Sequence, residues 1–190
     1  MLKNITGKEA LERLKAGNKK YVDNNVYQGD VSPRKRRNTF INGQAPYAVI
    51  ISCSDSRVIP EVIFSAGIGE LFTVRIAGNV IDNHQLGTIE YAVSHLGASL
   101  VVMMGHTHCG AVTAALTGHS NGYIQYVVDD IQAAIQGETD IDKACEKNVR
   151  HGVKLIQEAL NHIEETVLTE VQVVGAVYDI ETGHVHWLDN

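Results

Sequence analysis

The chain has 190 residues, of which 44% are apolar and 20% charged, a composition typical of one globular domain and not of a disordered segment. Its 16 Lys and Arg against 22 Asp and Glu give a formal net charge of −6, which disfavours nucleic acid or an acidic membrane surface as the main partner. The one basic run, residues 34–37, is therefore expected to be a solvated loop or helix face.

The longest unbroken apolar stretches, residues 48–51 and 100–104, are far shorter than the ~20 residues that a transmembrane helix needs. The N-terminus is charged from Lys3 onward and has no apolar signal segment, so we expect a cytoplasmic protein with no membrane partner. The 3 cysteines form an odd set, and a cytoplasmic chain has little use for disulfides. Free, metal-bound or catalytic thiols are the alternatives that remain.

A capping-box spacing from Thr6 to Glu9 precedes an apolar stripe and predicts an amphipathic helix from Thr6 to about Val22. Residues 23–45 are polar and interrupted by Gly and Pro, so we interpret them as an arm or connector that contains one short helix. Because this connector separates the first helix from the rest, we expect the stripe to pack against a second copy of the chain. The stripe consists of Ala10, Leu11, Leu14 and Tyr21.

The remaining residues alternate between short apolar runs and segments with helical spacing. This alternation predicts an α/β fold with a mainly parallel central sheet flanked by helices. We expect one domain over 1–190, with an N-terminal helical arm (1–45), an α/β core (46–190) and an antiparallel C-terminal edge strand. The expected strands are 47–52, 71–76, 99–104, 171–178 and 184–188, and the expected helices of the core are 86–96, 110–117, 121–136 and 141–163.

Two of the predicted strands run directly into residues that suit a metal. The first is followed by Cys53, and the third by His106 and Cys109. In parallel sheets, ligands bind beyond the carboxyl ends of the strands, where these residues would meet. Two thiolates and one imidazole suit zinc, and three protein ligands leave a fourth position for water, which is the catalytic pattern.

Asp55 and Arg57 follow the first candidate ligand at a spacing that allows a bidentate carboxylate–guanidinium pair. Such a pair would keep the carboxylate ionised beside the metal, although it could also be a structural ion pair that shapes the loop. Three other residues are of types that can bind a metal, but each has a simpler interpretation. Cys145 lies on the apolar stripe of the long helix and is expected in the core, and His184 and His186 are expected to be ordinary surface histidines.

The motifs CSDSR at 53–57 and HTHC at 106–109 resemble the two zinc motifs of the β-class carbonic anhydrases. The resemblance continues through residues 69–79, 89–93 and 173–183 and so covers nearly the whole chain.

It implies one Zn²⁺ per chain, bound by Cys53, His106 and Cys109. The implied activity is the reversible hydration of carbon dioxide to bicarbonate and a proton by attack of zinc-bound hydroxide. Asp55, held by Arg57, would orient the hydroxide or act as a conditional fourth ligand.

The same resemblance implies a substrate pocket and an assembly. The implied pocket residues are Gln44, Phe72, Ala77, Tyr91 and Gly110, with Gln44 hydrogen-bonding the substrate as in plant-type members. The implied assembly is a homodimer, which could pair further into a tetramer, with active sites near the subunit interface. His84 and Tyr91 are candidate proton shuttles.

Trp187 is the one tryptophan, and it does not lie in the approach to Cys53. This favours the open-site subgroup, which bicarbonate does not regulate. Three alternatives stay open: a carbonyl sulfide or carbon disulfide hydrolase on the same scaffold, a catalytically silent zinc-stabilised binding module, and a zinc hydrolase of larger substrates.

Overall fold

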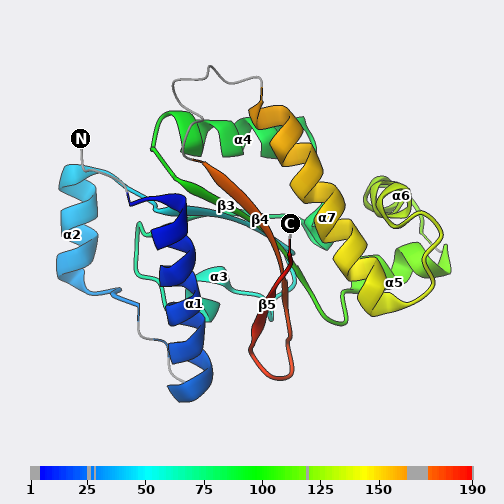
Figure 1. Ribbon diagram of the computed structural model, residues 1–190, viewed down its shortest axis with the longest axis horizontal. Coiled ribbons are helices and arrows are strands. Elements are labelled where there is room, and N and C mark those ends of the chain that lie inside the picture. The colour runs from blue at the N-terminus through cyan, green and yellow to red at the C-terminus, as the bar shows by residue number, and fades with distance from the viewer. Residues whose placement is uncertain (1–4, 25–26, 28, 119, 162–170, 190) are drawn as a thin grey trace.

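The computed structural model describes residues 5–24, 27, 29–118, 120–161 and 171–189. Its strands are β1 (Ala48–Ser52), β2 (Leu71–Arg75), β3 (Leu100–His106), β4 (Gln172–Tyr178) and β5 (Val185–Trp187). They form one five-stranded sheet in the order β2-β1-β3-β4-β5 (Figure 1). Strands β1 to β4 are parallel, and β5 pairs antiparallel with β4 at the edge. The predicted α/β class, with its mainly parallel sheet and antiparallel edge strand, is confirmed.

The helices are α1 (Gly7–Asn24), α2 (Pro33–Asn42), α3 (Pro60–Ile63), α4 (Asn83–Ser94), α5 (Gly110–Thr117), α6 (Ile124–Ile135) and α7 (Ile141–Leu160). The helical spacing does not predict α3 or the 3₁₀ turn η1 (Ala77–Asn79), because segments of four and three residues are too short to show a period. The predicted end of the last helix at residue 163 lies outside the described residues. Within the described ranges, no helix is long and apolar enough to cross a membrane.

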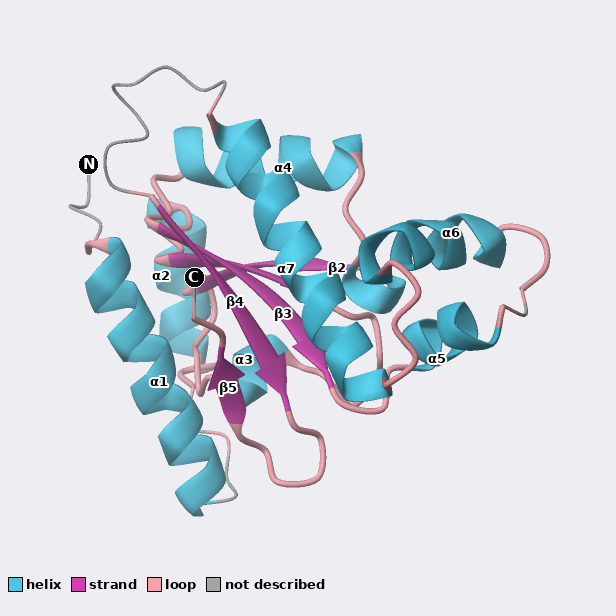
Figure 2. Cartoon of the chain, turned by 45° about the vertical axis from the view of Figure 1, so that its right-hand side comes forward, coloured by secondary structure: helices cyan, strands magenta, loops and turns pink. Residues whose placement is uncertain are grey.

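The sheet is buried on both faces. Helices α1 and α3 pack on one face, and α4 and α7 pack on the other, with α5 and α6 to one side (Figure 2). Every residue of β1 and β3 is buried, as their continuous apolar sequences predict. A third apolar cluster joins α5, α6 and α7 to Cys53 and Cys109 at the carboxyl end of the sheet.

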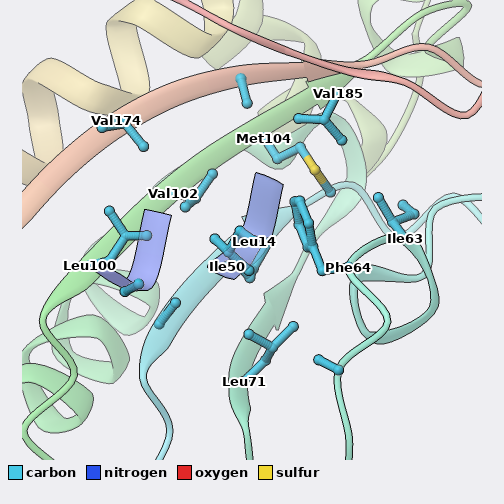
Figure 3. Packing of buried hydrophobic residues seen from close by; sticks show 14 of the residues in the cluster. Leu14, Ile50, Ile63, Phe64, Leu71, Leu100, Val102, Met104, Val174 and Val185 are labelled. Carbon is cyan, nitrogen blue, oxygen red and sulfur yellow. The ribbon is translucent and has the colours of Figure 1, made fainter. Parts of the chain in front are cut away.

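Helix α1 begins as predicted but packs differently from the expectation. The Thr6 hydroxyl accepts from the Glu9 backbone N–H at 3.2 Å, while the Glu9 carboxylate accepts from the Thr6 N–H at 2.8 Å. Ala10 and Leu14 are fully buried on the chain's own sheet, and Figure 3 shows Leu14 beside Ile50. The prediction that this stripe packs against a second copy is therefore wrong. Helix α1 covers a face of its own sheet that otherwise has only the four-residue α3.

Helix α2 has no buried residue and lies at the margin of the molecule (Figure 1). The basic run 34–37 falls on it, as expected for a solvated helix face, and Lys35 pairs with Glu70 at 3.2 Å. Near its end, Phe40 is 89% exposed and Ile41 is 63% exposed. Among the described residues of this part of the chain, the large exposed apolar side chains therefore lie on α2 and at Val31 just before it, and not on α1.

We predict that Leu14→Ala lowers the free energy of unfolding by about 2–5 kcal/mol, the cost of a large-to-small change in a packed core. Urea unfolding at two protein concentrations measures it, and the loss should be the same at both because the contacts lie within one chain. The exposed Glu12→Ala on the same helix is the control and should change stability by no more than ~0.5 kcal/mol. A loss of stability that appears only at the higher protein concentration would contradict the packing of α1 on the sheet of its own chain.

Candidate metal centre

Three buried side chains meet at the carboxyl end of the sheet. Cys53 follows β1, His106 ends β3, and Cys109 occupies the N-cap position of α5. Their ligand atoms all lie within 4.8 Å of one another, and the residues are 5%, 1% and 1% exposed. The structure thus brings together the three residues that the sequence singled out, in a group that could hold a metal ion.

The orientation of His106 suits a metal ligand. Its Nδ1 lies 2.8 Å from the carbonyl oxygen of Thr107, which can only accept, so Nδ1 carries the proton. The Nε2 atom is then a bare lone pair, and it is buried with no hydrogen-bond partner. A buried polar atom without a partner is costly, and a cation between Nε2 and the two sulfurs would satisfy it.

The two thiols differ in how readily they ionise. The adjacent Cys109 thiol lowers the pKa of Cys53 against the opposing effect of burial, and the His106 imidazole and the N–H groups of Asp55 and Gly78 lower it further. These N–H groups donate to the Cys53 sulfur at 3.4 and 3.3 Å. The same interaction raises the pKa of Cys109, as does burial. A cation would favour the ionisation of both sulfurs, and metal binding would release the proton that the pair retains.

Asp55 and Arg57 form the predicted bidentate pair. Arg57 donates from Nε to Asp55 Oδ1 at 2.9 Å and from a terminal nitrogen to Oδ2 at 2.7 Å. The guanidinium holds the pKa of the Asp55 carboxyl well below its usual range. Both carboxylate oxygens are directed to Arg57, and Asp55 is not part of the Cys53–His106–Cys109 group.

Sequence reasoning missed three residues that shape this centre. Arg75 lies on β2, opposite Ser52 of β1. It donates to the carbonyl oxygens of Cys53 and Asp55 at 3.3 and 2.8 Å. Gly78 supplies the N–H to Cys53, and Asn148 of α7 donates to the Gly78 carbonyl at 2.8 Å. Arg75 carried a weak signal, because it lies one residue before the end of the second predicted strand, 71–76. Contacts across 25 and 70 residues leave no local pattern in the sequence.

The predicted pocket residues are not all brought together within one chain. The rings of Phe72 and Tyr91 lie 6.3 Å apart, Tyr91 is 48% exposed, and Ala77 opens the η1 turn next to Gly78. Gly110 begins α5, and a Cβ built on it would meet nothing within 4 Å, so it leaves open space beside Cys109.

Gln44 is exposed and precedes β1, whereas Cys53 follows it. The five residues of β1 span about 16 Å at roughly 3.3 Å each. Gln44 therefore lies beyond the amino end of β1, whereas the candidate metal centre lies at its carboxyl end. The structure therefore does not bring Gln44 to the metal centre of its own chain.

The other candidates lie where the simpler interpretations placed them. Cys145 is buried on α7, and burial raises the pKa of its thiol to about 11. His184 and His186 are exposed, and Trp187 packs against Phe64 with ring centroids 6.2 Å apart. The side chain of His84 is 95% exposed at the start of α4, and its part in proton transfer stays a prediction.

Known proteins resemble this chain over most of its length. A family model described as carbonic anhydrase matches residues 48–185. Carbonic anhydrase 2 of Mycobacterium tuberculosis is 35% identical over 185 residues, which cover 92% of this chain and 89% of that protein. The solved structure of the β-carbonic anhydrase CafA of Aspergillus fumigatus has a TM-score of 0.70 and 29% identity, covering 96% of this chain and 90% of that one. A structure from a study of two tetrameric β-carbonic anhydrases of Sordaria macrospora has a TM-score of 0.70 and 25% identity, covering 96% and 98%.

We predict that the protein binds about one zinc per chain and that Cys53→Ala, His106→Ala and Cys109→Ala each abolish tight binding, since each removes one of three ligands. Metal analysis after dialysis against a weak chelator measures the zinc content. Cys145→Ala is the matched control, because it removes a buried thiol of the same cluster and should leave the zinc content unchanged. Full zinc occupancy in the His106→Ala protein would overturn the assignment.

Proposed function

The chain belongs to the β-carbonic anhydrase family, and we propose that it catalyses the reversible hydration of carbon dioxide to bicarbonate and a proton at a zinc ion bound by Cys53, His106 and Cys109. The observation that carries the zinc assignment is the convergence of two buried sulfurs on a buried, unpartnered imidazole Nε2. Thiolate ligands require reduced cysteines, which fits the reducing cytoplasm that we propose as the location.

The bound zinc would supply a Lewis acid that lowers the pKa of a coordinated water, though by less than a three-histidine site because two thiolates cancel the charge of the ion. The residues around it would hold and orient that water. Asp55, ionised through its pairing with Arg57, would accept a hydrogen bond from it and fix the direction of its lone pairs. Arg75 would keep this loop in place by binding the carbonyls of Cys53 and Asp55.

Carbon dioxide is small and apolar, and the proposed pocket suits it. Phe72 and Ala77 would form its apolar wall, and Gly110 would leave the space that a side chain would fill. Tyr91 lies at the exposed side of Phe72, where it could pass a proton toward solvent. None of these residues carries a charge, so water would not be held strongly where the substrate must bind.

A homodimer would supply the residue that one chain lacks. Gln44 lies beyond the amino end of its own β1, away from the candidate metal centre. It stands two residues after the end of α2, the helix that exposes Phe40 and Ile41. We propose that α2 docks on a second copy and brings Gln44 to that copy's pocket, where its amide would hydrogen-bond the substrate. A tetramer, as in the proteins from Sordaria macrospora, would be a pair of such dimers.

The experiment that tests the function is stopped-flow measurement of carbon dioxide hydration by the zinc-loaded protein across pH. Because the thiolates and Asp55 make the coordinated water less acidic than in a three-histidine enzyme, we expect activity to rise through the neutral range and to be highest in mild alkali. A hydration rate that does not change with pH would contradict the proposal that the charges of the thiolates and Asp55 set the acidity of the coordinated water. Absence of activity with full zinc would contradict the proposal, and much faster turnover of carbonyl sulfide would reassign the substrate.

We predict that Asp55→Asn and Arg57→Ala keep zinc and lose activity on the order of 10²-fold or more, the scale of a positioned proton acceptor. Hydration rate and zinc content are measured on the same samples. Arg150→Ala, which breaks another arginine–carboxylate pair on α7, is the control and should keep full activity. Unchanged turnover in Arg57→Ala would reduce the Asp55–Arg57 pair to a structural role.

We predict a dimer at micromolar concentration, and Phe40→Asp should weaken it because a charge would replace an apolar contact. Sedimentation velocity measures the association, and Lys19→Asp on the exposed side of α1 is a control for added negative charge. A monodisperse wild-type monomer would contradict the dimer, and also the assignment of Gln44 to a partner's pocket.

A further inference from the structure

The carboxamide of Asn148 connects α7 to the metal centre. Asn148 is 4% exposed, and its Nδ2 donates to the carbonyl oxygen of Gly78 at 2.8 Å. The N–H of the same Gly78 donates to the Cys53 sulfur at 3.3 Å. Gly78 is thus hydrogen-bonded on one side to a fixed helix and on the other to a candidate metal ligand.

Gly78 has no side chain to fix its position, so contacts from outside the turn help to hold it. It has φ +63°, and a Cβ there would lie 2.6 Å from Ile131 Cδ1 and 3.0 Å from Ala111 Cβ, so only glycine fits. Glycine is also the residue with the greatest backbone freedom, and its own side chain cannot restrain it. The backbone N–H of Asn79 donates to the Ile76 carbonyl at 2.9 Å, but its buried side-chain Nδ2 has no hydrogen-bond partner and so does not brace the turn.

Helix α7 is a rigid support for the Asn148 amide. It packs against β3 so closely that a Cβ on Gly105 would lie 2.6 Å from Val149 Cγ2, and a Cβ on Gly152 would overlap Met103. Asn148 precedes Val149 on this helix, and Gly105 precedes the ligand His106 on β3. The donor amide and the candidate ligand His106 are therefore held by the same packed pair of elements.

We propose that Asn148 is a positioning residue for the metal centre, which holds the Gly78 carbonyl so that the Gly78 N–H stays on the Cys53 sulfur. This N–H draws electron density from the sulfur and so sets how strongly Cys53 donates to the metal. The inference rests on the metal site of the proposed function and adds a role for a residue more than 30 positions from any ligand in the sequence.

The test uses the full-length protein loaded with Co²⁺, whose thiolate-to-metal charge-transfer band reports on the sulfur. Asn148→Leu removes the amide at similar size, and Asn148→Ala removes it without added bulk, in case the leucine variant fails to fold. The band should move to longer wavelength, because the sulfur lone pairs lose a stabilising N–H. Metal transfer to a chelator should show roughly ten- to a hundredfold weaker retention, as for other residues that orient metal ligands.

Asn18 provides a matched control. It is also buried, and its Nδ2 also donates to a glycine carbonyl, that of Gly183, at 2.9 Å. Asn18→Leu and Asn18→Ala should lower the melting temperature but leave the charge-transfer band and the metal retention as in the wild type.

An unchanged band and unchanged retention in both Asn148 variants would overturn the inference while leaving the proposed function intact. Wild-type protein that takes up no Co²⁺ would overturn both. Changes of equal size in the Asn18 variants would show that general destabilisation is responsible and would also overturn the role of Asn148.

Discussion

The metal centre depends on the parallel pairing of β1 with β3. In this register Ser52 lies opposite Met104, so the chain leaves β1 into Cys53 beside the end of β3, which carries His106. A slip of one residue would move Cys53 by about 3.3 Å and exchange the side chains that face the two helical layers. Such a displacement would separate the ligand atoms, which now lie within 4.8 Å of one another. The burial of both strands on both faces thus specifies the geometry of the site as well as the fold.

Burial also creates the electrostatic requirement that a cation meets. The pKa of Cys53 is lowered and that of Cys109 raised, and the buried imidazole nitrogen beside them has no hydrogen-bond partner, so a cation would stabilise the ionised form of both sulfurs. Asp55 and Arg57 have no such requirement, because each satisfies the charge of the other. An ion would satisfy the first group, whereas the Asp55–Arg57 pair already satisfies its own charges. This difference supports a division of roles between holding the metal and orienting what binds to it.

The sequence predicts the parts of this protein that local patterns encode. The strand ends identify Cys53, His106 and Cys109, and the spacing from Asp55 to Arg57 predicts their pairing. The stripe of α1 predicts a helix but not what it packs on, since an apolar stripe is the same whether it covers the chain's own sheet or a second subunit. Arg75, Gly78 and Asn148 reach the site from distant positions, and only the packed structure brings them there.

Close packing of glycines explains why such distant residues can act on one sulfur. At Gly105 and Gly152 the absence of a side chain lets α7 lie directly on β3, and at Gly78 it lets the η1 turn fit against α5 and α6. Each glycine adds backbone freedom to the unfolded chain and therefore opposes folding, so this packing carries an energetic cost. What the chain gains is close packing that holds the Gly78 N–H on the Cys53 sulfur, at 3.3 Å. A donor fixed by packed elements restrains the direction of the sulfur, and a ligand restrained in this way is the kind of support that a metal site needs.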